Sequence, residues 1–221
     1  TPDSRFYLLP PGIRRDRIAP EDYGERRARF RDEWQLQSGD KLVLLVGSGF
    51  RTKGLDRAIE ALASLDGDLL RRTRLMVIGQ DKSEPFAAQA RRLGVEDRVQ
   101  FLQGRDDIPA FLWGADLLIH PAYRENTGTV LLESMVAGLP VLTTDVCGYA
   151  HYVTEQGMGL VIDSPFEQAA LNRALKCLLF EREDDWRARG AKFAAESDIY
   201  SMPQRAAQLI VQGEGRATVP S

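Results

Sequence analysis

Long hydrophobic runs are absent from this 221-residue sequence. The longest uninterrupted apolar run, residues 42–46, is far shorter than the roughly 20 residues that a membrane-spanning helix needs. The amino terminus also lacks an initiator Met and the charged-then-apolar pattern of a signal peptide. We therefore expect no transmembrane helix, and we expect Thr1 to mark a cut through a longer chain.

Cysteine and net charge are also scarce. Cys147 and Cys177 have apolar neighbours and a spacing that fits neither a disulfide framework nor a metal site, so we expect buried free thiols in a reducing cytoplasm. The formal net charge is only −3, which gives no reason to expect nucleic acid or an anionic membrane as a partner. Arginines crowd residues 14–31, but acids alternate with them, and we interpret this segment as a solvated helix face.

Six short apolar runs, each followed by a helical pattern, dominate the rest of the sequence. They predict strands at 42–48, 74–79, 99–103, 116–120, 140–145 and 159–163. Because the runs are nearly all apolar and do not alternate with polar residues, helices should cover both faces of the sheet. The sequence thus predicts an α/β fold, a Rossmann-like doubly wound parallel sheet of about six strands.

Glycine and proline mark the ends of the helical patterns. Helices are predicted at 55–64, 85–93, 108–113 and 129–137, and after the last strand at 167–180, 183–196 and 203–212. We divide the chain into an interdomain connector with a leading helix (1–40), a Rossmann-like domain (41–200), and a C-terminal helix with a tail that frays from Gly213 (201–221).

A glycine-rich turn follows the first predicted strand. Such a turn lets a ligand approach the backbone, and the helix after it offers unpaired N–H groups to a phosphate. Its cations would neutralise a diphosphate, with a solvated surface loop as the alternative. The dinucleotide fingerprint is incomplete because Thr52 replaces its last glycine, which argues against a nicotinamide dehydrogenase. The phosphate-binding candidates are Gly47, Ser48, Gly49, Arg51 and Lys53.

Two glutamates eight positions apart, Glu125 and Glu133, flank the start of the predicted helix 129–137. Glu133 has largely apolar helical neighbours, and a carboxylate in such surroundings needs a partner. The hydroxyls of a ribose or hexose would satisfy it, and an ion pair with an arginine is the alternative. Between the two acids, helix N-terminal N–H groups would face a phosphate. These candidates are Asn126, Thr127, Gly128, Thr129 and Val130.

This spacing of Glu125 and Glu133, followed by Ala-Gly-Leu-Pro-Val at 137–141, resembles the donor-site signature of the retaining glycosyltransferases of family 4. The resemblance implies that Glu125 contacts and orients the transferred sugar, as the catalytic residue of this half, and that Glu133 binds the nucleotide ribose. Lys53 would hold the donor diphosphate. Where the family usually has an arginine after the first glycine this chain has Ser48, and Arg51 would take over that charge.

Segments 9–13, 59–65, 77–82 and 146–152 resemble the lipopolysaccharide-core α-1,3-glucosyltransferases of this family. These enzymes transfer glucose from UDP-glucose to an inner-core heptose at the cytoplasmic face of the inner membrane, which is compatible with peripheral membrane association. The resemblance implies the C-terminal half of a two-domain GT-B enzyme, with 41–200 as its donor-binding domain and Arg105 beside the uracil. The lipid-linked acceptor would bind a domain that precedes Thr1, so this chain should bind donor and hardly turn over.

Several alternatives stay open. No His, Cys or carboxylate cluster has metal-ligand spacing, so we expect no cofactor and a metal-independent site, and we interpret Asp66-Gly67-Asp68 as a turn. His120 is expected either to be structural or to touch the donor edge. A UDP-sugar epimerase would need no lipid acceptor, and a phosphorylase would need inorganic phosphate. A non-catalytic nucleotide-binding module would tolerate the loss of Glu125.

Overall fold

The computed structural model describes residues 7–180 and 186–214. Within them, six strands form one parallel sheet in the order β3-β2-β1-β4-β5-β6. Each strand overlaps one of the six predicted runs, which confirms the doubly wound parallel sheet. The strands are β1 (Lys41–Val46), β2 (Thr73–Ile78), β3 (Val99–Leu102), β4 (Leu117–His120), β5 (Val141–Thr144) and β6 (Gly159–Ile162).

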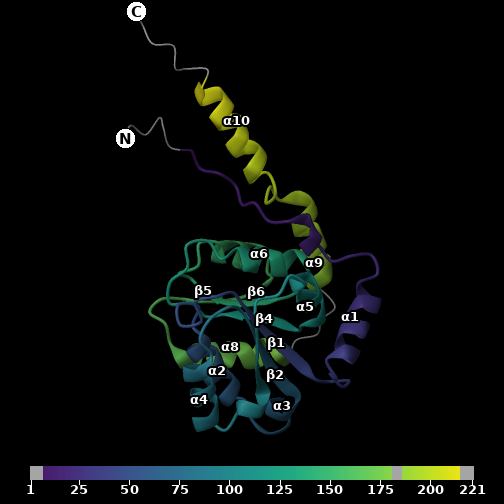
Figure 1. Cartoon of the computed structure of the whole chain (residues 1–221), viewed down its shortest axis with the longest axis vertical. Coiled ribbons are helices and arrows are strands. Elements are labelled where there is room, and N and C mark those ends of the chain that lie inside the picture. The colour runs from purple at the N-terminus through teal and green to yellow at the C-terminus, as the bar shows by residue number, and fades with distance from the viewer. Residues whose placement is uncertain (1–6, 181–185, 215–221) are drawn as a thin grey trace, which may run out of the picture.

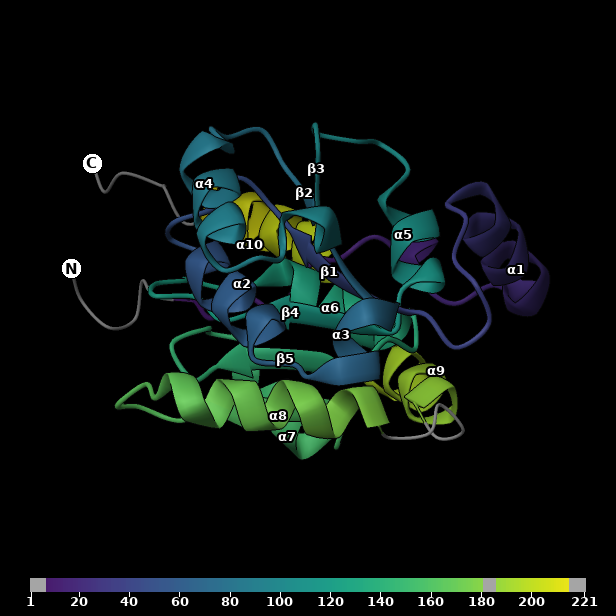
Figure 2. The ribbon, with the colours of Figure 1, turned by 90° about the horizontal axis from the view of Figure 1, so that it is seen from below.

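Apolar side chains project from both faces of the sheet, because successive residues of a strand point to opposite sides. Leu42 and Leu44 of β1 join one core cluster, and Val43 and Leu45 join the other. The first cluster lies under α1 (Tyr23–Glu33), α5 (Ile108–Gly114), α6 (Thr129–Val136), α7 (Ala150–Glu155) and α9 (Trp186–Glu196). The second lies under α2 (Leu55–Ala63), α3 (Gly67–Arg72), α4 (Glu84–Arg92) and α8 (Gln168–Phe180). Figure 1 shows these two helix layers with the sheet between them, and Figure 2 shows the second layer from below.

The predicted helices are present with ends shifted by only a few residues, although residues 183–185 of one of them lie outside the described residues. The structure adds α3 and α7. The prediction of a simple turn at Asp66-Gly67-Asp68 is wrong, since Asp66 precedes α3 as its N-cap residue and the other two begin the helix. Asp66 pairs with Lys176 at 3.0 Å, and Asp68 pairs with Arg72 at 2.8 Å. These carboxylates thus form exposed ion pairs at the surface, one with α8 and one within α3.

The leading helix α1 packs on α5 and adds to the core of the domain. Phe30 of α1 is buried and meets Phe111 edge-on, with ring centroids 5.0 Å apart. Arg27 and Arg31 both reach Asp116, so the prediction of a solvated arginine face is wrong for these two residues. The division at residue 40 into a connector and a domain stays a prediction.

The two ends of the described chain leave the body of the domain on the side covered by α6 and α9 (Figure 1). They start from a common point, where the Ile13 amide donates to the Ile199 carbonyl at 3.0 Å. From there α10 (Met202–Glu214) runs outward. The helix thus continues past its predicted end at residue 212, the predicted fraying from Gly213 stays a prediction, and residues 215–221 of the tail lie outside the described residues.

The order of the strands reverses at the centre of the sheet. β1 pairs with β2 on one side and with β4 on the other, so the connections that leave the carboxyl ends of β1 and β4 run to opposite sides. In open α/β sheets, ligands bind in the crevice at this switch point. Here the crevice lies between the loop after β1 (47–54) and the loop after β4 (121–128), which carry most of the predicted site residues.

Candidate functional site

The two loops at the switch point are held against each other by close backbone contact. Gly54 has a φ of +74°, and a Cβ added there would lie 2.0 Å from the Pro121 carbonyl oxygen, so only glycine fits. The Tyr123 amide donates to the Thr52 carbonyl at 2.9 Å. Arg57 of α2 donates to the carbonyls of Pro121 and Ala122, each at 3.1 Å. The relative position of the two loops is therefore fixed by the fold.

The loop after β1 is also braced from β2. The Phe50 amide donates to the Asp81 carboxylate at 2.8 Å, and the Gln80 amide donates to the Ser48 hydroxyl at 3.1 Å. The hydrogen bond from the Lys82 amide, and then that from the Phe50 amide, lower the pKa of Asp81. The Phe50 amide is thereby committed to Asp81, and the side chain of Ser48 serves to hold the loop. Gly47 keeps a φ of +122° and makes room for the Lys53 side chain, which would lie 2.7 Å from an added Cβ.

A charged cluster forms where the loops meet. The Lys53 ammonium lies 2.5 Å from Oε2 of Glu125, and Nε2 of His120 lies 3.4 Å from the same oxygen. The hydrogen bond with His120 and then the Lys53 ammonium lower the pKa of Glu125 to about 2, although burial opposes them. Glu125 is thus a carboxylate at neutral pH. The structure brings together Lys53 and Glu125, which the sequence pointed to separately.

A hollow of about 340 Å³ opens beside this cluster. It takes its walls from both loops, and its lining contains five of the predicted site residues. The lining residues are Ser48, Gly49, Thr52, Lys53, Arg124, Glu125 and Asn126. A concave site with a few convergent polar groups at a switch point has the form of a ligand site.

The amino end of α6 lies next along the chain. Gly128 precedes the helix with a φ of +79°, and no side chain caps the helix. The first amide hydrogen bond of the helix is from Leu131 to the Gly128 carbonyl at 2.9 Å. Among the described residues, the amides of Thr129 and Val130 form no hydrogen bond. The carbonyls of Asn126 and Thr127 face the loop 148–149. The unpaired amides of Thr129 and Val130 are therefore the groups at this helix end that could bind an anion.

The second glutamate lies apart from this cluster. Glu133 sits in the middle of α6, and its Oε1 lies 3.3 Å from Nε of Arg17, which belongs to a short 3₁₀ turn (Arg15–Arg17) in the leading segment. Burial raises the pKa of Glu133 despite the nearby guanidinium of Arg17. Without ligand, therefore, the ion-pair alternative describes Glu133. The role of Glu133 toward a ribose stays a prediction.

The two glutamates should affect stability in opposite directions. A lowered pKa means that the Glu125 carboxylate stabilises the fold above about pH 4.5, and that this is lost as the pH falls toward 2. A raised pKa means that the protonated Glu133 carboxyl favours folding, and that this contribution to stability is lost as the pH rises. At pH 7 we expect Glu125→Gln to lower the free energy of unfolding by about 1–2 kcal/mol and Glu133→Gln to raise it.

Urea unfolding at pH 7 and at pH 3.5 measures this difference. At pH 3.5 Glu133→Gln should approach the wild type, because that carboxyl is then largely protonated in both the folded and the unfolded chain. Glu125→Gln should still keep part of its deficit at pH 3.5, because the folded-state pKa of Glu125 is about 2 and its contribution disappears only near that pH. A Glu133→Gln variant that is less stable than the wild type at pH 7 would show that the ion pair with Arg17 outweighs the burial of the carboxylate.

Two further predicted cations behave differently. Arg51 is exposed and forms no ion pair with another residue in the described ranges, so it is available to a ligand. Arg105 binds both carboxylate oxygens of Asp107, each at 2.7 Å, and its guanidinium lies 5.0 Å from the centre of the Phe111 ring. Its proximity to a base stays a prediction. The backbone of Gly104 lies close against the side chain of Gln80.

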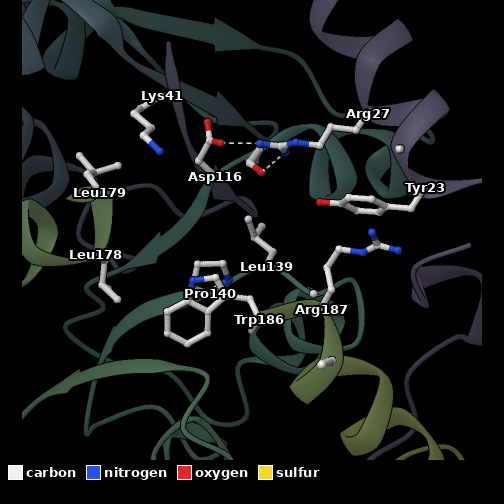
Figure 3. Close-up of a pocket in the computed structure, with 14 residues that line it drawn as sticks. Tyr23, Arg27, Lys41, Asp116, Leu139, Pro140, Leu178, Leu179, Trp186 and Arg187 are labelled. Carbon is white, nitrogen blue, oxygen red and sulfur yellow. Dashed lines mark hydrogen bonds and ion pairs between the residues drawn. The ribbon is translucent and has the colours of Figure 1, made fainter. Parts of the chain in front are cut away.

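A second cavity, about 430 Å³ and so larger than the switch-point hollow, lies elsewhere (Figure 3). It opens between α1 and α9 at the amino edge of the sheet, where Lys41 begins β1 and Asp116 precedes β4. None of the predicted site residues lines it. Figure 3 shows Arg27 reaching across to Asp116, which is a contact that holds α1 to the sheet. Volume alone therefore does not identify the site.

Sequence reasoning left His120 open between a structural role and a contact at the donor edge, and it gave no warning of Arg17. His120 stood out only as the last residue of an apolar run five positions before Glu125, and Arg17 carried no signal beyond its position in an arginine-rich segment. Across the described ranges, no group of three His, Cys, Asp or Glu side chains could hold a metal ion. In the same residues, no helix is both long and apolar enough to cross a bilayer.

Comparison with known proteins identifies the family of the chain. The family model described as "Glycosyl transferases group 1" matches residues 26–193. Lipopolysaccharide glucosyltransferase WaaG of Escherichia coli (strain K12) is 46% identical over 215 residues, which cover 96% of this chain and 58% of that protein. This chain therefore spans little more than half the length of that relative.

Solved structures show the same fold. The crystal structure of WaaG, a glycosyltransferase involved in lipopolysaccharide biosynthesis, superposes with a TM-score of 0.92 over 95% of this chain and 57% of the other, at 46% identity. The Anabaena protein Alr3699/HepE, solved in complex with UDP-glucose, superposes with a TM-score of 0.78 over 93% of this chain and 57% of its own, at 21% identity. The strand order, the switch-point site and the family match over most of the chain lead to one conclusion: this chain belongs to the glycosyl transferases group 1.

Proposed function

We propose that this chain is the donor-binding half of a retaining glucosyltransferase, which takes glucose from UDP-glucose and transfers it to the heptose of the lipopolysaccharide inner core. The observation that carries the proposal is the pairing of Lys53 with Glu125 beside the free amides of α6. The 46% identity to WaaG supports the lipopolysaccharide acceptor, and the complex of HepE with UDP-glucose supports the donor.

The donor diphosphate would lie between Lys53 and the amino end of α6. As the bond to the sugar breaks, negative charge develops on the leaving diphosphate, and preorganised positive groups stabilise it. Lys53, Arg51 and the amides of Thr129 and Val130 would supply that stabilisation, so the proposed site works without a metal ion. Binding the diphosphate draws the Lys53 ammonium away from Glu125, whose carboxylate then accepts hydrogen bonds from the sugar hydroxyls.

The ribose would bind at Glu133. A carboxylate accepts hydrogen bonds from two neighbouring hydroxyls, and in this way the ribose would replace or share the contact with Arg17, 3.3 Å away. The uracil would lie against the backbone of the turn 104–106. Acceptor binding belongs, in this proposal, to a preceding domain, and the enzyme works in the cytoplasm with peripheral contact to the inner membrane.

Calorimetry without divalent metal tests the proposal. UDP and UDP-glucose are expected to bind the 221-residue chain, and NAD is not. Glu133→Ala should weaken UDP binding about tenfold or more, because hydrogen bonds to a charged group contribute about 1.5–3 kcal/mol. Glu60→Ala, which changes an exposed glutamate on α2, is the matched control and should bind as the wild type does. Binding of NAD alone would overturn the proposal.

A further inference from the structure

His120 is a fully buried histidine at the carboxyl end of β4. None of its surface is exposed, and its Nε2 lies 3.4 Å from Oε2 of Glu125. Its other ring nitrogen, Nδ1, is buried and has no hydrogen-bond partner in the described part of the chain. The backbone holds the residue in place, since the Thr143 hydroxyl donates to the His120 carbonyl at 3.0 Å. Burying a polar ring with one unpaired nitrogen costs free energy, and the contact with Glu125 is the hydrogen bond that offsets part of this cost.

The contact with Glu125 fixes the tautomer of the ring. A carboxylate can only accept a hydrogen bond, so the proton of the interaction must come from His120. Burial lowers the pKa of His120 and keeps the ring neutral, which leaves it one N–H. The charged groups that act on the ring are the Glu125 carboxylate and the Lys53 ammonium. The buried Cys147 thiol lies beside Glu125, to which its backbone bridges. The proton therefore sits on Nε2, and Nδ1 carries the lone pair.

The two partners of Glu125 share one oxygen. Lys53 and His120 both bind Oε2, and within the described residues Oε1 has neither a hydrogen bond nor an ion pair. Lys53 is on an exposed loop and is the group that a diphosphate would attract. His120 is fixed in the sheet, so it keeps its hold on Oε2 after Lys53 has turned to the phosphates.

We propose that His120 is a positioning residue for sugar binding, whose neutral Nε2–H holds Oε2 of Glu125 so that Oε1 remains available to the hydroxyls of the transferred sugar. This inference rests on the proposed function and deepens it. It assigns to His120 an effect on the sugar and none on the nucleotide, since the ring contacts only the carboxylate that meets the sugar.

Two amide variants separate this role from a merely structural one. In His120→Gln the amide nitrogen is as many bonds from Cα as Nε2 is, so it can still donate to Glu125. In His120→Asn the amide nitrogen corresponds to Nδ1 and falls short of the carboxylate. Both variants bury one amide in place of an imidazole, and a shared loss of stability therefore cancels in the comparison between them.

The first test uses the unliganded 221-residue chain and does not depend on the proposed function. Nitrogen NMR of the wild type should show a protonated Nε2 and an unprotonated Nδ1 for His120. This measurement needs no variant. Carbon NMR of the Glu125 carboxyl should show a pKa about one pH unit higher in His120→Asn than in the wild type, and near the wild-type value in His120→Gln. A proton on Nδ1 in the wild type would overturn the inference, and so would a Glu125 pKa in His120→Asn that equals the wild-type value.

The second test is the affinity for two ligands, measured by calorimetry. His120→Asn should weaken UDP-glucose binding about tenfold while UDP binding stays within about a factor of two, and His120→Gln should retain both affinities. Equal losses for UDP and UDP-glucose in His120→Asn would overturn the positioning role. If the wild type binds neither ligand, the proposed function fails, and the tautomer and the Glu125 pKa still decide whether His120 holds the carboxylate.

Discussion

Replacing Lys53 with methionine is expected to weaken UDP binding about tenfold to a hundredfold. Methionine keeps an unbranched side chain as far as Cε, the part that passes over Gly47, but it removes the ammonium that would meet the diphosphate. One hydrogen bond to a charged group contributes about 1.5–3 kcal/mol, which corresponds to this range of affinity. The Glu125 carboxylate, 2.5 Å from the ammonium in the wild type, would also lose its counter-charge and repel the phosphates.

Calorimetry with UDP at two salt concentrations measures this effect. The wild-type affinity should fall as salt rises, and the Lys53→Met affinity should depend less on salt, because one ionic contact is missing. Lys192→Met, on the exposed side of α9, is the matched control and should leave binding unchanged. Wild-type affinity in Lys53→Met would mean that the diphosphate binds elsewhere.

Replacing Asp116 with alanine is expected to lower the free energy of unfolding by about 3–5 kcal/mol. The carboxylate of Asp116 is only 6% exposed and pairs with Arg27 at 2.5 Å and Arg31 at 3.1 Å. It also accepts a hydrogen bond from the Leu42 amide at 2.6 Å. Its loss leaves two half-buried guanidinium groups without their main acceptor, at the contact that holds α1 to the sheet (Figure 3).

Urea unfolding of Asp116→Ala and Asp116→Asn measures the size of this contribution. Asparagine keeps an acceptor for the Leu42 amide but removes the charge, so we expect an intermediate stability. UDP binding to the folded fraction should stay close to that of the wild type, because Asp116 lies at the opposite edge of the sheet from the loops that form the site. A loss below about 1 kcal/mol for Asp116→Ala would show that the two arginines find other acceptors or water.

The sequence predicted the sheet well because its signal is local. A nearly all-apolar run such as 42–46 can be satisfied only by cover on both faces, and the glycines after the runs mark where the strands end. The spacing of Glu125 and Glu133 is local too, because one lies in the loop before α6 and the other within α6. Lys53 and Glu125 could be expected at the same edge, since the carboxyl ends of parallel strands meet there.

The sequence could not predict contacts between distant segments. Arg17 meets Glu133 only because the leading segment folds back over α6, and Arg27 meets Asp116 only because α1 packs on α5. Cys177 was expected to be buried but is exposed, since it lies on the outer side of α8. Each of these depends on which face of an element turns outward, which tertiary packing decides.

A structure of the chain with bound UDP tests the central claim most directly. The account predicts the diphosphate between the Lys53 ammonium and the amides of Thr129 and Val130, with the ribose hydroxyls on Glu133 and the uracil at the turn 104–106. Arg17 should then have lost or shared its contact with Glu133. UDP bound in the cavity between α1 and α9, with the switch-point hollow unoccupied, would contradict the account.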